Sequence, residues 1–385
     1  MNRKMKRLRT VHFVGMGGSG MSGIAEVMIG LGYKIQGSDI RMSEQLERLK
    51  ALGAKVFLSH LPENIKKADA LVVSSAISSN NCEVVEAKKK MLPVVARAEM
   101  LAELMRFYYS IAVSGTHGKT TTTSLISTLL AEGGLDPTYI IGGCLKSSNS
   151  HAKLGLGEYL VAEADESDAS FTHLKPMISI LTNIDFDHMS TYEHDKNKLY
   201  SGFLSFLHNL PFYGLAIVCL DDPGVKEVMP KISRSMITYG TTDKADIYAK
   251  DIHFSESKTS FEVYRKNKNK KISVELNLPG IHNIQNALAA IAVATELDID
   301  DKSIIEAFKN FSGINRRFQV TKNITVKDGK ITLIDDYGHH PTEILATINA
   351  IKSGWGSKRI TLLFQPHRYT RTKELFSEFV EVLSQ

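Results

Sequence analysis

Apolar and polar positions alternate in blocks from the start of the chain. Short apolar runs, each about the length of a buried strand, lie at 11–15, 33–39, 55–59, 68–75 and 92–97. Segments with apolar residues at helical spacing separate them, at 21–32, 43–53, 82–91 and 99–107. Strands that alternate with helices in this way are typical of a parallel sheet buried between layers of helices. The sequence therefore predicts an α/β fold.

The alternation restarts twice. At residue 108 a new apolar run, a glycine-containing loop and a long helix pattern begin a second domain. Further on, the pattern predicts buried strands within 158–167, 177–188 and 215–222, antiparallel strands with a basic hairpin tip within 247–280, and helices at 282–297 and 301–311. After Arg317, strand-helix patterns resume at 331–352 and 359–383, so a strand is expected to begin at residue 359.

Composition narrows the class of protein. A chain of 385 residues is long enough for two or three domains, and its formal charge of +5 gives no case for nucleic-acid binding. No run approaches the roughly 20 apolar residues that a membrane span needs. Cys82, Cys144 and Cys219 are far apart, which indicates neither a disulfide framework nor a zinc knuckle. These features fit a soluble cytoplasmic protein.

Two glycine loops follow apolar runs. Gly15, Gly17 and Gly20 have the spacing G-x-G-x-x-G, and Asp39 follows where an acid that binds a ribose would be expected. Such a loop lets the backbone approach a pyrophosphate closely, so a nicotinamide or flavin dinucleotide is one interpretation at this point.

The second loop, GTHGKTTT at 115–122, gives the strongest signal in the chain. Its backbone N–H groups are expected to bind phosphate, Lys119 to reach the outer phosphates and Thr120 to place a hydroxyl on Mg²⁺. The full phosphate-loop pattern has another glycine where this chain has Val113, so the loop is a shortened variant. A plain helix cap with a surface lysine is the alternative.

Two acidic clusters follow predicted strands of the same domain. One offers Glu163, Asp165, Glu166 and Asp168, and the other offers Asp185, Asp187 and His188. Oxygen ligands suit Mg²⁺, and ligands gather at the carboxyl ends of parallel strands. The clusters predict a metal-assisted phosphoryl site, although each alone could be a solvated loop.

The last segment carries two further motifs, DDYGHHP at 335–341 and QPHRYTRT at 365–372. Adjacent histidines before a proline are often a capped turn. Arg368 and Arg371 lie about a turn apart and could bind a carboxylate or phosphate together, or could begin a solvated helix.

Eight motifs in order, from GMGGSGM through GTHGKTTT, EADESD, TNIDFDHM, PGIHNIQNALAA, INRRF and DDYGHHPTE to QPHRYTRT, resemble the Mur ligase family, and most closely its alanine-adding branch. The resemblance implies three domains: an N-terminal Rossmann-like domain at 1–107, a central P-loop ATPase-like domain with a mostly parallel sheet at 108–314, and a C-terminal Rossmann-like domain at 315–385. It also favours a UDP-sugar over a dinucleotide in the first loop, held by Gly15, Gly17, Gly18, Ser19, Gly20, Asp39 and Ser75.

The resemblance further implies an ATP-dependent reaction of peptidoglycan precursor synthesis, and so a part in cell-wall formation, cell shape and cell division. ATP phosphorylates the lactyl carboxylate of UDP-N-acetylmuramate, and the amine of L-alanine attacks the acyl phosphate. The implied ATP site comprises Ser114, Gly115, Thr116, His117, Gly118, Lys119, Thr120, Asn283, Arg317 and Asp336. The implied Mg²⁺ ligands are Thr120, Glu163 and His188. The implied catalytic residues are Lys119, His188, Arg368 and Arg371. The implied amino-acid site is formed by Tyr337, His339, His367, Arg368 and Arg371.

Two departures from the family pattern give further expectations. Several sister ligases carry a modified lysine where this chain has Phe203, as the alanine-adding branch does, and Lys196 and Lys198 are out of register. The C-terminal domain is also shorter than usual, so we expect it to be incomplete. The alternatives are a muropeptide ligase of wall recycling and a non-catalytic form that binds nucleotide. We expect no nucleic-acid or membrane partner, and a monomer or weak homo-oligomer.

Overall fold

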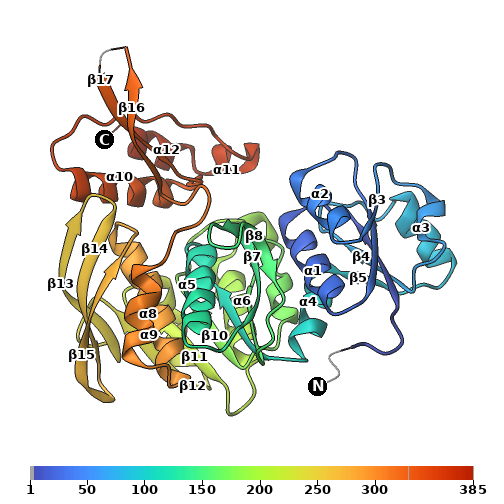
Figure 1. Cartoon of the computed structure of the whole chain (residues 1–385), viewed down its shortest axis with the longest axis horizontal. Helices are drawn as coiled ribbons and strands as arrows, with labels where there is room; N and C mark the ends of the chain where they lie inside the picture. Colours follow the sequence, from blue (N-terminus) through green and yellow to red (C-terminus); the bar gives the residue numbers. More distant parts are fainter. Residues whose placement is uncertain (1–3, 328, 385) are drawn as a thin grey trace.

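The computed structural model describes residues 4–327 and 329–384, and it contains three α/β units arranged along the chain (Figure 1). The first unit lies at one end of the molecule, the central unit in the middle, and the third unit against the far side of the central one (Figure 1). Most sheet neighbours in the first two units are parallel, which confirms the predicted α/β class. Within the described residues, no helix is both long and apolar enough to span a bilayer.

The first unit has a five-stranded parallel sheet in the order β3-β2-β1-β4-β5. Chain order reverses at β1, and ligands bind beyond the carboxyl end of such a strand. The glycine loop follows β1 directly. The elements are β1 (Thr10–Val14), α1 (Ser19–Gly30), β2 (Lys34–Ser38), α2 (Glu44–Ala51), β3 (Lys55–Phe57), β4 (Ala70–Val73), α3 (Cys82–Lys89), β5 (Val94–Ala96) and α4 (Arg97–Met105).

The central unit has a ten-stranded sheet in the order β15-β14-β13-β12-β11-β10-β6-β9-β7-β8. Its strands are β6 (Tyr109–Ser114), β7 (Thr138–Leu145), β8 (Ser150–Lys153), β9 (Tyr159–Glu163), β10 (Ile178–Leu181), β11 (Leu215–Cys219), β12 (Ser235–Gly240), β13 (Ile247–Ser255), β14 (Lys258–Arg265) and β15 (Lys268–Leu276). Its helices are α5 (Lys119–Glu132), α6 (Lys196–His208), α7 (Pro223–Val228), α8 (Ile281–Glu296) and α9 (Asp301–Lys309).

The order of the central strands positions the phosphate loop. β6 lies between β9 and β10 and pairs in parallel with both. Because parallel strands end at the same edge, the loop after β6 lies beside the two acidic segments that follow β9 and β10. The antiparallel strands predicted within 247–280 are confirmed as β13, β14 and β15.

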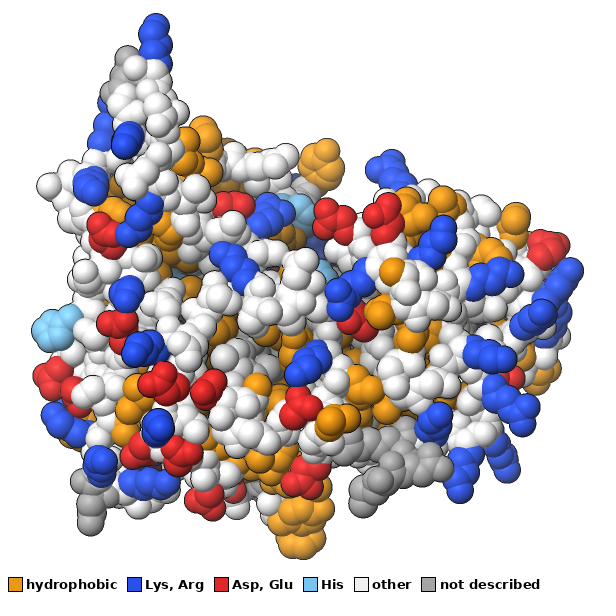
Figure 2. Space-filling view, viewed as in Figure 1, with side chains coloured by type: hydrophobic (Ala, Val, Ile, Leu, Met, Phe, Trp, Pro, Cys, Tyr) orange, Lys and Arg blue, Asp and Glu red, His pale blue; other side chains and the backbone are white. Residues whose placement is uncertain are grey.

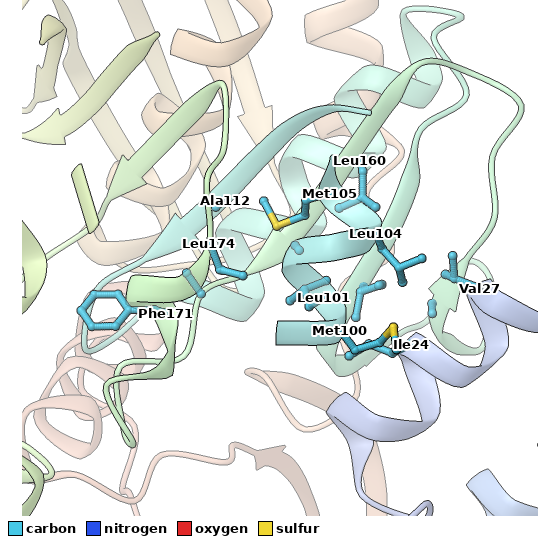
Figure 3. Packing of buried hydrophobic residues seen from close by; sticks show 14 of the residues in the cluster. Ile24, Val27, Met100, Leu101, Leu104, Met105, Ala112, Leu160, Phe171 and Leu174 are labelled. Carbon is cyan, nitrogen blue, oxygen red and sulfur yellow. The ribbon is translucent and has the colours of Figure 1, made fainter. Parts of the chain in front are cut away.

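Apolar packing joins the first two units. Ile24 and Val27 of α1 lie beside Leu104 of α4, and residues of the central sheet, such as Leu160, lie beyond that helix (Figure 3). All of them belong to one buried cluster. Gly23 brings α1 close to the central sheet, because a Cβ there would lie 3.2 Å from Ile140 Cγ2. The first unit is therefore held to the central unit by a continuous core.

The third unit is smaller, with strands β16 (Gln319–Val326) and β17 (Gly329–Asp335) and helices α10 (Pro341–Trp355), α11 (Tyr369–Glu374) and α12 (Phe376–Leu383). The two strands form an antiparallel hairpin that projects from the molecule (Figure 1). The strand expected from residue 359 is wrong: in the structure as described, residues 358–368 have no regular secondary structure, and Leu363 is 91% exposed. No described strand pairs with this segment, so none supplies the hydrogen bonds that a strand needs.

Candidate active site

Two cavities meet at the phosphate loop. The larger, about 850 Å³, is lined by all three units, and the smaller, about 540 Å³, lies between the central and third units. His117, Gly118, Arg317 and Glu343 line both. The surface is hollowed between the third and first units, with charged and histidine side chains around the hollow (Figure 2). A ligand whose phosphates lie at this shared loop can therefore extend into both cavities.

The backbone geometry of the loop after β6 suits the binding of phosphate. Gly118 has a φ of +82°, and a Cβ there would lie 2.6 Å from Asn286 Oδ1. The N–H of His117 donates to Asn183 Oδ1 at 2.8 Å, which ties the loop to the segment after β10. α5 begins at Lys119, so its free N–H groups and positive dipole end favour an anion. Ser114 is fully buried beneath the loop and donates to Ile180 O, so it supports the loop from below.

Lys119 is paired within the protein in this structure. Its Nζ lies 2.7 Å from Glu166 Oε2 and donates to the carbonyl oxygens of Gly115 and Thr116 at 2.7 and 3.0 Å. Burial raises the pKa of Glu166 to about 7 against the opposing effect of Lys119. The sequence pointed to Glu166 only as one carboxylate among several, so its contact with the loop lysine was missed.

The proposed magnesium ligands line the larger cavity together: Thr120, Glu163 and His188. Glu163 accepts a hydrogen bond from the N–H of Gly142 at 2.7 Å, and burial raises the pKa of its carboxyl group. Burial lowers the pKa of His188 to about 4, so its imidazole is neutral, as a metal ligand must be. A partly buried carboxylate, a hydroxyl and a neutral imidazole fit a divalent cation.

Three further acids of these clusters pair with basic side chains of the protein: Asp165, Asp185 and Asp187. Asp185 Oδ2 lies 3.0 Å from His117 Nε2, and Asp187 is bound to Arg371. Asp165 pairs with Arg97 at 3.2 Å, which connects α4 of the first unit to the segment after β9. In this structure Asp185 and Asp187 each neutralise a neighbouring side chain. That they offer ligands to Mg²⁺ stays a prediction.

The residues expected at the amino-acid site meet on one wall of the larger cavity. The ring of Tyr337 lies 5.2 Å from that of His339 and 6.5 Å from that of His367, between centroids. Arg368 Nη1 lies 3.2 Å from His188 Nδ1. The segment that failed to form a strand thus still carries His367 and Arg368 to the site.

The smaller cavity contains three of the residues expected at the ATP site. Asn283, Arg317 and Asp336 line it, together with aromatic and apolar side chains that suit a flat base: Phe186, Tyr200, Tyr239, Leu278 and Phe318. Asn283 Nδ2 donates to Pro279 O at 2.7 Å. Asp336 accepts from the N–H groups of Phe318 and Gly338 at 2.8 and 2.7 Å.

The first glycine loop reaches the larger cavity through Gly18, Ser19 and Gly20. Gly15 has a φ of +78° and turns the chain out of β1. The N–H of Gly17 donates to Asp39 Oδ2 at 2.8 Å, so Asp39 holds the loop. Ser75 is exposed, and its neighbour Ser74 lines the cavity. The structure thus brings three of the seven expected residues to the cavity wall.

Models of three families match successive parts of the chain: "Mur ligase family, catalytic domain" at 10–109, "Mur ligase middle domain" at 113–294 and "Mur ligase, glutamate ligase domain" at 316–385. Among solved structures, the UDP-N-acetylmuramate-alanine ligase MurC of Thermotoga maritima is 30% identical, with a TM-score of 0.81 over 95% of this chain and 83% of that one.

Two peptide ligases are also similar. The UDP-N-acetylmuramate:L-alanyl-γ-D-glutamyl-meso-diaminopimelate ligase of Neisseria meningitides is 26% identical, with a TM-score of 0.72 over 80% of this chain and 100% of that one. A murein peptide ligase of Psychrobacter arcticus is 25% identical, with a TM-score of 0.77 over 94% of this chain and 79% of that one. The order of the three family models and these likenesses confirm the resemblance seen in the motifs. The chain belongs to the Mur ligase family.

Proposed function

We propose that the protein is an ATP- and Mg²⁺-dependent ligase that joins L-alanine to the lactyl carboxylate of UDP-N-acetylmuramate. The observation that carries the proposal is the convergence of three elements on one cavity: the glycine loop after β1, the phosphate loop after β6, and the aromatic and basic residues of the third unit. The likeness to a UDP-N-acetylmuramate-alanine ligase over 95% of the chain supports it. We also propose that the three domains span residues 1–107, 108–314 and 315–385.

The proposed mechanism assigns one task to each wall of the cavity. The first unit holds the UDP group and presents the carboxylate. The phosphate loop holds the outer phosphates of ATP. Lys119 gives up its contact with Glu166 and neutralises charge on the transferred phosphate group. A carboxylate is a poor electrophile, so transfer of the terminal phosphate to it activates its carbonyl carbon. Positioning and fixed charge supply most of the catalysis in such transfers.

Mg²⁺ would be held by Thr120, Glu163 and His188, where it would neutralise charge on the phosphates. The amine of L-alanine then attacks the activated carbonyl, and phosphate leaves. Arg368 is exposed and lies next to His188, where its charge can stabilise the departing phosphate. The rings of Tyr337, His339 and His367 would enclose the alanine. We place the reaction in the cytoplasm, where ATP and UDP-sugars are made, and expect a monomer or weak homo-oligomer.

Addition of a whole peptide is the second candidate, because peptide ligases are 25% and 26% identical to this chain. The test is phosphate release with Mg·ATP and UDP-N-acetylmuramate, with L-alanine, glycine, L-serine or the tripeptide L-alanyl-γ-D-glutamyl-meso-diaminopimelate as the acceptor. We expect L-alanine to give the highest kcat/KM. Faster release with the tripeptide would replace the proposal by the second candidate, and ATP binding without release would favour the non-catalytic alternative.

A further inference from the structure

Three metal-ligating side chains meet at the junction of the central and third units, outside the proposed magnesium ligands. His117 belongs to the phosphate loop, Asp185 follows β10, and His340 precedes α10. One ligand atom from each lies within 4.8 Å of the others. We propose that these side chains bind a transition-metal ion of the zinc class, which ties α10 to the phosphate loop.

The geometry suits a small ion with tetrahedral preference. His117 Nε2 and His340 Nδ1 lie 3.0 and 3.7 Å from Asp185 Oδ2. A tetrahedral zinc ion with bonds of about 2.0–2.1 Å separates its ligand atoms by roughly 3.3–3.4 Å. The two histidine rings have centroids 4.8 Å apart and are inclined at 49°. The two distances to Asp185 Oδ2 lie on either side of this spacing.

A second carboxylate orients the first histidine. Glu343 Oε1 lies 3.3 Å from His117 Nδ1, on the opposite side of the ring from Asp185. A histidine that ligates a metal through one nitrogen usually donates its other N–H to a carboxylate in this way. Without an ion, the proton between His117 Nε2 and Asp185 Oδ2 occupies the position that the metal takes. An ion-pair network that never binds metal is the competing explanation.

His340 adds an independent observation. It is 4% exposed, and its Nε2 has no hydrogen-bond partner among the described residues. Its Nδ1 has only a long capping contact, 3.3 Å from the N–H of Thr342. The buried imidazole is therefore incompletely satisfied at Nε2, while Nδ1, the nitrogen 3.7 Å from Asp185 Oδ2, has no described partner closer than this capping contact. Two imidazoles and one carboxylate favour zinc, cobalt, nickel or copper over Mg²⁺.

The hydrogen bonds already made by Asp185 are compatible with this ion. Its Oδ2 also accepts from Thr342 Oγ1 at 2.8 Å, and its Oδ1 accepts from the N–H of Phe186 at 2.8 Å. Both donors would hold the carboxylate in place while the ion replaced the proton of His117. Because His340 caps α10 and Thr342 lies in its first turn, the bound ion would fix that helix on the central unit.

Co²⁺ is the probe, because its absorption spectrum reports tetrahedral coordination by nitrogen and oxygen. The full chain, stripped with a chelator and kept without nucleotide, is titrated with Co²⁺ in excess Mg²⁺, and Zn²⁺ is then added as a competitor. We expect one equivalent of Co²⁺ with visible absorption that Zn²⁺ abolishes. His340→Asn keeps an acceptor that caps α10 but removes the imidazole, and should weaken binding at least about a hundredfold. Glu343→Gln should weaken it about 10–100-fold.

His194→Asn is the control, since it removes an exposed imidazole away from the three proposed ligands and should leave Co²⁺ affinity unchanged. Circular dichroism of each variant checks that the chain is folded. Native Co²⁺ affinity in His340→Asn, or no Co²⁺ binding by the native chain, would overturn the proposal. Loss of the signal in Glu163→Gln with retention in His340→Asn would place the ion on the magnesium ligands and would also overturn it. Since no turnover is measured, failure of the ligase proposal is seen separately.

Discussion

Arg371 of α11 binds Asp187 of the central unit through two guanidinium nitrogens. Nη2 lies 2.8 Å from Oδ2, and Nε lies 3.2 Å from Oδ1. The two side chains are only 3% and 9% exposed. A two-point contact of this kind fixes orientation as well as distance. The arginine that the motif assigned to substrate is thus already used to hold the third unit in place.

We therefore predict that Arg371→Ala loosens α11 and α12. Removing one partner of a buried pair leaves the other charge uncompensated, which costs about 3–5 kcal/mol. Hydrogen exchange across 369–383 should accelerate at least about tenfold, while exchange in β1 and β6 stays the same. Arg368→Ala is the control, because Arg368 is exposed and should leave exchange in this segment nearly unchanged. Native protection of α11 in Arg371→Ala would contradict the role given to the pair.

A second prediction concerns Lys119. The positive charge of Lys119 is expected to neutralise the outer phosphates of ATP. Lys119→Ala should therefore lower the rate of phosphate release at least about a hundredfold, which is the effect of losing one preorganised donor. UDP-N-acetylmuramate should bind with native affinity, since its loop belongs to another unit. Phosphate release and calorimetry measure the two effects. Lys153→Ala is the control: it removes an exposed lysine paired with Asp136 and should change neither the rate of phosphate release nor the affinity for UDP-N-acetylmuramate.

If UDP-sugar affinity collapses in Lys119→Ala while phosphate release survives, the assignment of the two glycine loops is reversed. The double variant Lys119→Ala/Glu166→Gln guards against a folding artefact, because it removes the buried carboxylate that the single variant leaves unpaired. Its stability to urea should exceed that of Lys119→Ala, and its turnover should stay low.

A third prediction separates two neighbouring glycines of the first loop. A Cβ on Gly17 would lie 2.9 Å from Asp39 Oδ2 and 3.2 Å from Ser43 Oγ, whereas on Gly18 the nearest atom is Gly15 O at 3.7 Å. Gly17→Ala should therefore disturb the loop and weaken UDP-N-acetylmuramate binding at least about tenfold, or about 1.4 kcal/mol. Gly18→Ala should fold with native stability. Calorimetry measures the affinity and urea unfolding the stability.

ATP affinity in Gly17→Ala should match that of the native chain, because the phosphate loop belongs to the central unit. NAD and FAD should give no heat of binding with the native protein. Micromolar affinity for either would restore the dinucleotide interpretation of this loop.

The sequence predicted the framework of the site well, because strands, loops and their order depend on local patterns. Both glycine loops follow the strands expected for them, and the acidic segments do follow β9 and β10. The individual acids could not be told apart. Glu166 pairs with a lysine 47 residues away, and Asp187 with an arginine 184 residues away. Such pairings depend on tertiary structure that no local spacing contains.

The strand expected from residue 359 failed for a related reason. Its sequence, RITLLFQ, has the apolar content of a buried strand. A strand also needs a neighbour to accept its hydrogen bonds, and β17 pairs with β16 alone within the described part of the chain. Local pattern indicates which segments can form strands, but the neighbour decides whether they do.

The last prediction is a pH dependence of the docking of α10. Asp185 and Glu343 raise the pKa of His117 to about 9, although burial alone would lower it. The pKa in the unfolded chain is about 6.5. A group whose pKa is raised on folding stabilises the folded state below its unfolded pKa, and this contribution is lost as pH rises through the folded pKa. The contribution of His117 to the free energy of unfolding is therefore complete below about pH 6.5 and lost by about pH 9.

Trp355 reports this loss. It is the single tryptophan of the chain, it ends α10, and its ring lies 6.0 Å from that of Phe318. With a chelator present, the urea midpoint of its fluorescence should fall between about pH 6.5 and pH 9. His117→Gln removes the titrating group and should flatten this fall, while Glu378→Gln on the exposed face of α12 should not. An equal fall in His117→Gln and the native chain would show that another group controls the docking of α10.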